Sequence, residues 1–270
     1  MQGVSDLSST KIKLDKINKV FKTRRQTINA LSDIDIEVYD NEFISIVGPS
    51  GCGKSTIIRI INDIIKPTSG DVYIDEERFG KKVSREVIRK MGFIFQQPNL
   101  LPWLTVKGNI ELPLKVFKIY DKKSTGKTRE LLEMMGLKEY ENAYPSELSG
   151  GMTQRVGVLR AMIHEPEILL MDEPFGSLDE KLREQMDLKL LDIWQKLHQT
   201  IVFITHNIVE AILLASRIYV MNTNPGRVVE VIKIDFPYPR DMNLLIDPKF
   251  IEYQNKIVNL IGELHLKEIK

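Results

Sequence analysis

The fold is decided by one stretch of sequence, Gly48-Pro49-Ser50-Gly51-Cys52-Gly53-Lys54-Ser55-Thr56. It follows the apolar run Phe43 to Val47, which we expect to be a buried strand, and precedes Ile57-Ile58-Arg59-Ile60-Ile61, the start of a helix. The glycines let successive backbone N–H groups approach an anion, and the helix N-terminus adds unpaired donors. Strand, glycine-rich turn, Lys-Ser pair and helix therefore predict a nucleoside triphosphate site rather than an ordinary turn.

Two side chains of this stretch have expected roles in phosphate chemistry. Lys54 is placed to reach the β- and γ-phosphates, and the Ser55 hydroxyl to hold a magnesium ion that bridges them. Cys52 occupies a variable slot of the loop, where we interpret it as a small packing residue rather than a catalytic group.

Composition narrows the class of protein. The 270 residues carry 38 Lys+Arg and 37 Asp+Glu, a net charge of +1. Because proteins that bind nucleic acid are commonly basic, this balance argues against nucleic acid as the main partner. The single cysteine excludes an internal disulfide framework and favours a reducing compartment. Residues 1–10 do not resemble a signal peptide, and no apolar run has transmembrane length, so we expect a soluble chain.

Beyond the phosphate loop, buried strands and helices alternate. Apolar runs and helical periodicity predict strands at 168–171, 201–204 and 217–221 and helices at 179–198 and 208–215. This alternation is typical of a mostly parallel sheet covered by helices.

Three segments depart from that pattern. Residues 11–38 contain two short alternating segments, Lys11–Leu14 and Ala30–Val38, which predict half-buried antiparallel strands. Residues 104–120 and 122–137 predict two helices with lysine-rich faces, which we interpret as solvated rather than as a binding patch. The tail predicts one amphipathic helix, whose apolar stripe is Phe250, Tyr253, Ile257, Leu260, Ile261 and Leu264.

Polar residues follow two of the predicted strands. Asp172 and Glu173 come directly after the predicted strand at 168–171, at the end of the strand where α/β sheets bind ligands. Asp172 is expected to hold magnesium and Glu173 to deprotonate an attacking water, the alternative being a surface charge pair. His206 follows the predicted strand at 201–204. We interpret it as a contact for the γ-phosphate, the alternative being a simple polar cap of the strand.

A second glycine motif, Leu148-Ser149-Gly150-Gly151-Met152, precedes an apolar helix. It offers backbone donors at a helix N-terminus. Because one pocket has little need of two anion sites, this one is interpreted as serving a nucleotide held by a second copy of the chain.

Together these motifs make the chain, from about Ile12 to Met221, resemble the ATP-binding subunits of ABC transporters. In family order they are the adenine-stacking aromatic Phe21, the Walker A loop Gly48 to Ser55 with the adjoining ATP-binding Thr56, the Q-loop Gln96, the signature Leu148 to Met152, the Walker B pair Asp172 and Glu173, the D-loop Ser177-Leu178-Asp179 and the switch His206. Three positions depart from the usual pattern without removing a catalytic group, namely Asn41, Met152 and Asn207.

The resemblance implies a P-loop (RecA-like) α/β fold: a mostly parallel sheet core, an N-terminal antiparallel β subdomain and an inserted helical subdomain. We expect the core with its β subdomain at 11–96 and 163–235, the helical subdomain at 97–162 and a tail at 236–270. The resemblance further implies that ATP and Mg²⁺ are the cofactors. The expected catalytic residues are Lys54, Gln96, Glu173 and His206, and the expected magnesium ligands are Ser55, Gln96 and Asp172.

The same resemblance implies partners and a location. Two copies would sandwich two ATP molecules, and permease subunits would dock beside Gln96 to Trp103 at the cytoplasmic face of the cell membrane. A solute-binding protein would take part indirectly. Trp103 is interpreted as a permease contact, the alternative being a core aromatic.

Four segments resemble the corresponding segments in the ATP-binding subunits of importers for nitrate, aliphatic sulfonates, taurine and pyrimidine precursors. They are Gln97 to Val106, Asp172 to Asp179, Asn224 to Arg227 and Pro237 to Arg240. An exporter subunit and a soluble ABC ATPase without a transport role stay open as alternatives. No residue of the chain encodes the solute.

Overall fold

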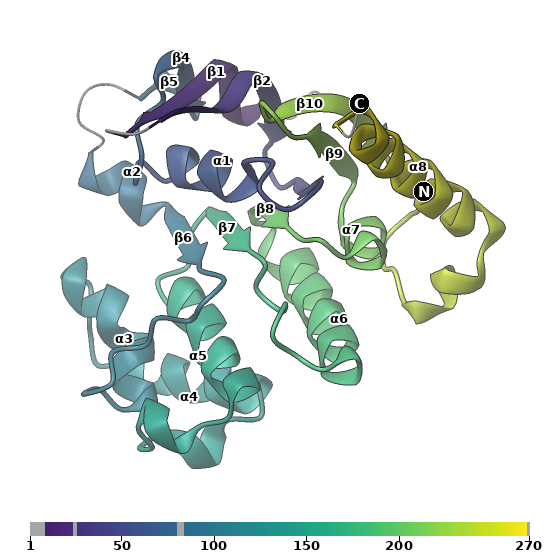
Figure 1. The fold of residues 1–270 in the computed structure, drawn as a ribbon. Coiled ribbons are helices and arrows are strands. Elements are labelled where there is room, and N and C mark those ends of the chain that lie inside the picture. The colour runs from purple at the N-terminus through teal and green to yellow at the C-terminus, as the bar shows by residue number, and fades with distance from the viewer. Residues whose placement is uncertain (1–8, 24–25, 80–83, 269–270) are drawn as a thin grey trace.

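Helix α1 (Lys54–Ile61) lies between two β-sheets (Figure 1). The structure, a computed structural model, describes residues 9–23, 26–79 and 84–268, with the side chains described as far as residue 262. Four isoleucines of α1, at 57, 58, 60 and 61, are buried against both sheets. Each such side chain contributes about 1.5–3 kcal/mol of burial free energy, so α1 is fixed as the base of the loop before it.

The larger sheet has six strands in the order β10-β9-β3-β8-β7-β6. They are β3 (Phe43–Val47), β6 (Met91–Ile94), β7 (Ile168–Asp172), β8 (Thr200–Ile204), β9 (Arg217–Asn222) and β10 (Arg227–Lys233). All neighbours pair in parallel except β9 and β10. Every residue of β3, β7 and β8 is buried, and their sequences are accordingly apolar except at Ser45, Asp172 and Thr200. The predicted mostly parallel sheet is confirmed.

Two strands of this sheet, β6 and β10, were not predicted from the sequence. The run of β6 is four residues long and includes Gly92, so it is too short for its periodicity to stand out. Strand β10 lies at the sheet edge, and Val229 and Val231 on it are exposed, so no apolar core pattern marks it.

The smaller sheet is antiparallel, as predicted, with the order β2-β1-β4-β5. Its strands are β1 (Thr10–Lys22), β2 (Thr27–Tyr39), β4 (Ser69–Ile74) and β5 (Glu77–Arg78). The expectation of two short segments in residues 11–38 was wrong, because β1 and β2 have 13 residues each. Left-handed residues, Lys16 at φ 49° and Asp33 at φ 54°, and several register shifts interrupt their alternation.

A helical group lies beyond β6 (Figure 1). It contains α3 (Val106–Val116), α4 (Ser124–Met134), α5 (Gly150–Met162) and the single turns η1 (Lys138–Tyr140) and η2 (Pro145–Glu147). Helix α3 is shorter than predicted, since the Thr105 hydroxyl caps it by accepting from Gly108 N at 3.1 Å.

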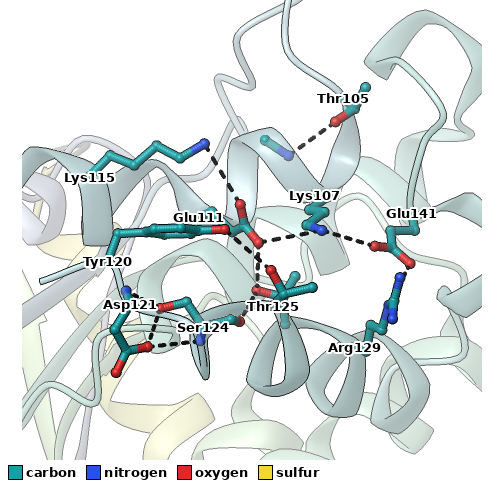
Figure 2. A network of polar contacts seen from close by, with 12 residues as sticks. Thr105, Lys107, Glu111, Lys115, Tyr120, Asp121, Ser124, Thr125, Arg129 and Glu141 are labelled. Atoms are coloured by element: carbon teal, nitrogen blue, oxygen red, sulfur yellow. Dashed lines mark hydrogen bonds and ion pairs between the residues drawn. The ribbon is translucent and has the colours of Figure 1, made fainter.

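Several lysines of this group form local ion pairs, two of which, Lys107 and Lys115, are drawn in Figure 2. Lys107 and Lys115 flank Glu111 at 3.9 and 3.7 Å, and Lys107 also pairs with Glu141 at 3.3 Å. Lys127 pairs with Glu165 at 2.8 Å. These pairs favour the interpretation of a solvated, locally neutralised face.

The remaining helices are α2 (Arg85–Arg89), α6 (Glu180–Leu197), α7 (Ile208–Leu214), η3 (Met242–Ile246) and α8 (Pro248–Glu268). The tail helix α8 packs on α7 and β9 and buries Phe250 and Ile257 of the predicted stripe. Leu264 of that stripe lies outside the residues with described side chains. The domain boundaries given above stay a prediction.

Candidate functional site

The loop between β3 and α1 has the backbone of an anion cradle. Gly51 and Gly53 adopt the left-handed φ values of 80° and 99°. A Cβ on Gly53 would overlap the Leu31 side chain of β2, whereas one on Gly51 would meet nothing within 4 Å. The loop is therefore packed tightly on its inner side and open at its tip, where a ligand can approach the backbone.

Lys54 turns its side chain into this loop. It is 7% exposed, and Nζ donates to the carbonyl oxygens of Gly48 at 2.7 Å and Pro49 at 3.0 Å. Phosphate oxygens would offer this ammonium charge-assisted hydrogen bonds in place of neutral carbonyls. The nearby Cys52 is buried, and burial raises the pKa of its thiol although Lys54 opposes this. A neutral, packed thiol agrees with the structural role expected for Cys52.

Ser55 and Asp172 join the first turn of α1 to the end of β7. The Ser55 hydroxyl donates to Asp172 Oδ1 at 2.9 Å. Asp172 is 4% exposed, and burial raises the pKa of its carboxyl against the opposing effects of the Ser55 hydrogen bond and Arg59. A hydroxyl and a carboxylate side by side are oxygen ligands of the kind a hard divalent cation prefers.

Three polar side chains meet just after three neighbouring strands. Glu173 Oε2 accepts from Gln96 Nε2 at 3.1 Å and lies 3.3 Å from His206 Nδ1. Gln96 follows β6, Glu173 follows β7 and His206 follows β8. The carboxyl ends of parallel strands share one edge of the sheet. Gln96 and Glu173, which are 77 positions apart in the sequence, therefore meet there, and His206 joins them.

Glu173 is held in an unusual backbone conformation. Its φ is 47°, in the left-handed region that a glutamate seldom adopts. Its N–H donates to Ile204 O of the neighbouring strand at 3.0 Å, which fixes this conformation. Strain maintained by the surrounding structure is characteristic of functional positions.

The signature and the D-loop adjoin each other at helix N-termini. Ser149 Oγ accepts from Met152 N at 3.3 Å and caps α5, and Asp179 Oδ1 accepts from Leu182 N at 3.0 Å and caps α6. A Cβ on Gly151 would lie 3.0 Å from Leu178 Cδ2, whereas Gly150 is exposed with nothing within 4 Å. The donors at the start of α5 are thus open to an outside ligand.

The other predicted residues lie in or beside these segments. Gly48, Pro49, Ser50 and Cys52 are in the loop, Thr56 is in the first turn of α1, Leu148 and Met152 flank the start of α5, and Ser177 and Leu178 precede α6. Phe21 stands near the end of β1, paired with Ile28 of β2, and Lys19 Nζ lies 4.9 Å from its ring centroid. Its contact with adenine stays a prediction.

The structure adds two residues that hold the segment after Gln96. Asn109 is buried in α3, where its amide accepts from Leu101 N at 2.7 Å and donates to the carbonyls of Leu101, Leu104 and Thr105. Arg160 of α5 donates to Asn99 O at 3.0 Å. The sequence signal for Asn109 was an amide beside Val106 and Ile110 on an apolar helix face.

The hydrogen bonds of Asn109 and Arg160 hold a loop on which Trp103 is exposed to solvent. The side chain is 70% exposed, so the alternative of a core aromatic is excluded. A large exposed aromatic on a loop held by buried hydrogen bonds is suited to anchoring a partner.

Comparison with known proteins identifies the family. The model of the family described as ABC transporter matches residues 31–176, which is more than half of the chain. The chain belongs to the ABC transporter family. It is an ATP-binding cassette with ATPase function, as predicted.

Individual relatives of this ABC cassette cover nearly its whole length. It is 39% identical to the aliphatic sulfonates import ATP-binding protein SsuB of Bacillus cereus, over 92% of this chain and 94% of that protein. It is 38% identical to the nitrate import ATP-binding protein NrtD of Synechocystis, over 93% and 94%.

A solved structure confirms the fold of the cassette. It is the dimeric post-hydrolysis state of an ATP-binding cassette bound to ADP and Pi, with a TM-score of 0.76 and 36% identity over 84% of this chain and all of that one. Among the described residues of the present cassette, no helix is long and apolar enough to cross a bilayer.

Proposed function

We propose that this cassette is the ATP-hydrolysing subunit of an importer for a small solute of the nitrate, sulfonate, taurine or pyrimidine-precursor type. The observation that carries the proposal is the meeting of Gln96, Glu173 and His206 at the sheet edge that also holds the phosphate loop. The relatives named for sulfonate and nitrate import support the direction of transport and the solute class.

The side chains divide the work of hydrolysis. Lys54 would leave its loop carbonyls and bind the β- and γ-phosphates. Glu173 would accept the proton of the attacking water, with Gln96 orienting its carboxylate. His206 would contact the γ-phosphate and hold it beside Glu173. The contacts of Gln96 and His206 with Glu173 support these roles.

Magnesium is the metal that the donor set fits. Ser55, Asp172 and the Gln96 amide offer oxygen ligands, and the described residues contain no cluster of three His, Cys, Asp or Glu side chains that would form a site by themselves. A cation here would therefore share its coordination between protein and phosphate, as Mg²⁺ commonly does. When bound, it would neutralise charge on the β- and γ-phosphates.

The exposed N-terminus of α5 implies a second copy of the chain. Its donors at Ser149 to Gly151 would bind the γ-phosphate held by the phosphate loop of the partner copy, closing two ATP molecules between two cassettes. The dimeric assembly of the similar solved cassette supports this arrangement. ATP-driven closure and hydrolysis-driven opening would then supply the motion for transport.

The segment Gln96 to Trp103 is the proposed permease contact. It joins a residue that touches Glu173 to the exposed Trp103, so a partner docked at Trp103 would be linked to the catalytic edge. The cassette would work at the cytoplasmic face of the membrane through this permease. A solute-binding protein would select the solute and act only indirectly.

Purification from detergent-solubilised native membranes tests the transport role. A tagged chain should recover a multi-span permease, identified by mass spectrometry, and a binding protein encoded beside it would reveal the solute by its bound ligand. Recovery only from the soluble fraction with ribosomal or chromosomal proteins would overturn the transport role. A partner that exports its substrate would instead support the alternative of an exporter ATPase.

A further inference from the structure

Arg183, in the first turn of α6, reaches two loops of the catalytic edge at once. Its Nη2 donates to Leu178 O at 2.9 Å and its Nε to Phe175 O at 3.4 Å, so it holds the loop that leads from Glu173 to Asp179. The same Nε lies 3.4 Å from Glu210 Oε1 on α7. One guanidinium therefore joins the D-loop to the helix that follows His206.

Glu210 in turn holds the residues on both sides of His206. The Thr205 hydroxyl donates to Glu210 Oε2, and Thr205 Oγ1 accepts from Asn207 N at 2.9 Å. Asn207 Oδ1 caps α7 by accepting from Val209 N at 2.9 Å. The backbone that carries His206 is thus clamped between Thr205 and Asn207, both tied to the start of α7.

Arg183 also acts electrostatically on two buried carboxyl groups. Glu210 and Asp187 are both buried, and Asp187 Oδ1 has no hydrogen-bond partner. Burial raises the pKa of both carboxyls, and Arg183 is a cation that acts on both in the opposite direction. Removal of Arg183 would leave two buried carboxyl groups without the cation that acts on both, which costs free energy unless one moves or is neutralised.

We propose that Arg183 and Glu210 are a positioning pair that couples the D-loop to the switch histidine. A displacement of the loop from Phe175 to Asp179 would pass through Arg183 to Glu210 and shift His206 relative to Glu173. The inference rests on the proposed function for one point, the contact of the D-loop with a partner copy. Closure of the dimer would then be what moves His206 into place.

The test is steady-state ATP hydrolysis by the full chain and its variants Arg183→Met and Glu210→Gln. Each should lower kcat by about tenfold or more while KM and the Kd of a non-hydrolysable ATP analogue change by less than about threefold, since neither residue touches the nucleotide. Arg183→Lys should recover much of the rate, because a lysine can still reach Glu210 or Leu178 O. Lys196→Met is the matched control, because Lys196 is an exposed lysine of the same helix that pairs with Asp192 at 2.6 Å on the surface.

A double-mutant cycle separates coupling from general damage. If the two residues act as one unit, Arg183→Met combined with Glu210→Gln should lose no more activity than either single variant. Losses that multiply, or that follow the fall in melting temperature across all variants, would overturn the proposal. Glu210→Gln keeps the size of the side chain and its bond with Thr205, so it serves where Arg183→Met folds poorly.

The outcome also distinguishes this inference from the proposed function. Full turnover by Glu173→Gln would contradict the assigned catalysis whatever Arg183 does. Loss of turnover in Glu173→Gln together with wild-type rates in both Arg183→Met and Glu210→Gln would overturn the coupling alone.

Discussion

His206 Nδ1 lies 3.3 Å from Glu173 Oε2, on the side chain that also accepts a hydrogen bond from Gln96. The carboxylate is therefore held from two sides, by groups that follow the two neighbouring strands β6 and β8. A carboxylate held in this way would need no reorganisation to act as the proposed base toward an attacking water.

The first prediction concerns this carboxylate. Glu173→Gln should retain ATP binding and lower turnover by about 10²–10⁴-fold, because an amide cannot accept the proton of water. Phosphate release measures turnover and a nucleotide titration measures binding. Hydrolysis at the wild-type rate would remove Glu173 from the role of base.

The phosphate loop leads to a prediction about binding. Lys54→Ala should raise the Kd for ATP by about tenfold to a hundredfold, since charged hydrogen bonds contribute about 1.5–3 kcal/mol. Isothermal titration of the purified chain gives this Kd. The control is Lys66→Ala, which removes an exposed lysine that pairs with Asp63 beyond α1. Equal affinity in Lys54→Ala and wild type would contradict the assignment.

Asp187 gives a pH-dependent prediction of stability. Burial and the neighbouring Glu210 raise the pKa of the Asp187 carboxyl well above its ordinary value, with Arg183 opposing. Because the folded pKa is higher than the unfolded one, the stability that this group contributes is complete below about pH 4 and is lost as the pH rises through the folded pKa. An asparagine has no such loss.

The melting temperature of Asp187→Asn relative to wild type should therefore increase between pH 5 and pH 8. Differential scanning fluorimetry across this range makes the comparison. Asp192→Asn is the control, because Asp192 is exposed and paired with Lys196. A difference that stays constant with pH, or falls, would show that Asp187 does not carry this linkage.

The end of α7 supplies a prediction about the tail. Arg240 is buried and its Nη1 donates to Ile212 O at 2.9 Å and Ala215 O at 2.8 Å, while the Tyr238 hydroxyl donates to Leu214 O at 2.8 Å. These bonds satisfy carbonyls that a helix C-terminus leaves unpaired. Burial also raises the pKa of Tyr238 to about 12, which keeps its hydroxyl a donor.

Arg240→Met should consequently lower the free energy of unfolding by about 2–4 kcal/mol, because it leaves buried carbonyls without donors. Tyr238→Phe removes a single bond and should cost about 1 kcal/mol. Urea denaturation of both variants gives the two values. A loss below about 0.5 kcal/mol for Arg240→Met, the range of ordinary surface substitutions, would mean that the tail does not stabilise α7.

Trp103 tests the proposed permease surface. Trp103→Ala should leave the melting temperature unchanged, because the side chain is 70% exposed, and should reduce recovery of the permease in the purification described above. Asn109→Ala provides the comparison, since it removes the clamp behind the loop and should lower both. Normal permease recovery with Trp103→Ala would place the docking surface elsewhere.

The sequence by itself determined the features that depend on neighbouring residues. Gly51, Gly53, Lys54 and Ser55 lie within five consecutive residues, so their spacing between an apolar strand and a helix was enough to predict the phosphate loop. The predominantly apolar segments of β3, β7 and β8 likewise predicted a buried parallel sheet, because strands covered on both faces have no solvent-facing polar side.

Only the tertiary structure decided which distant residues meet. The strand order β3-β8-β7-β6 brings Gln96 and His206 to Glu173, and the packing of α6 on α7 brings Arg183 to Glu210. It also decided that Trp103 is exposed and that β1 and β2 run through their irregular positions. The physical reason is that these contacts depend on sheet order and helix packing, which involve the whole chain, whereas turn chemistry and periodicity act over a few residues.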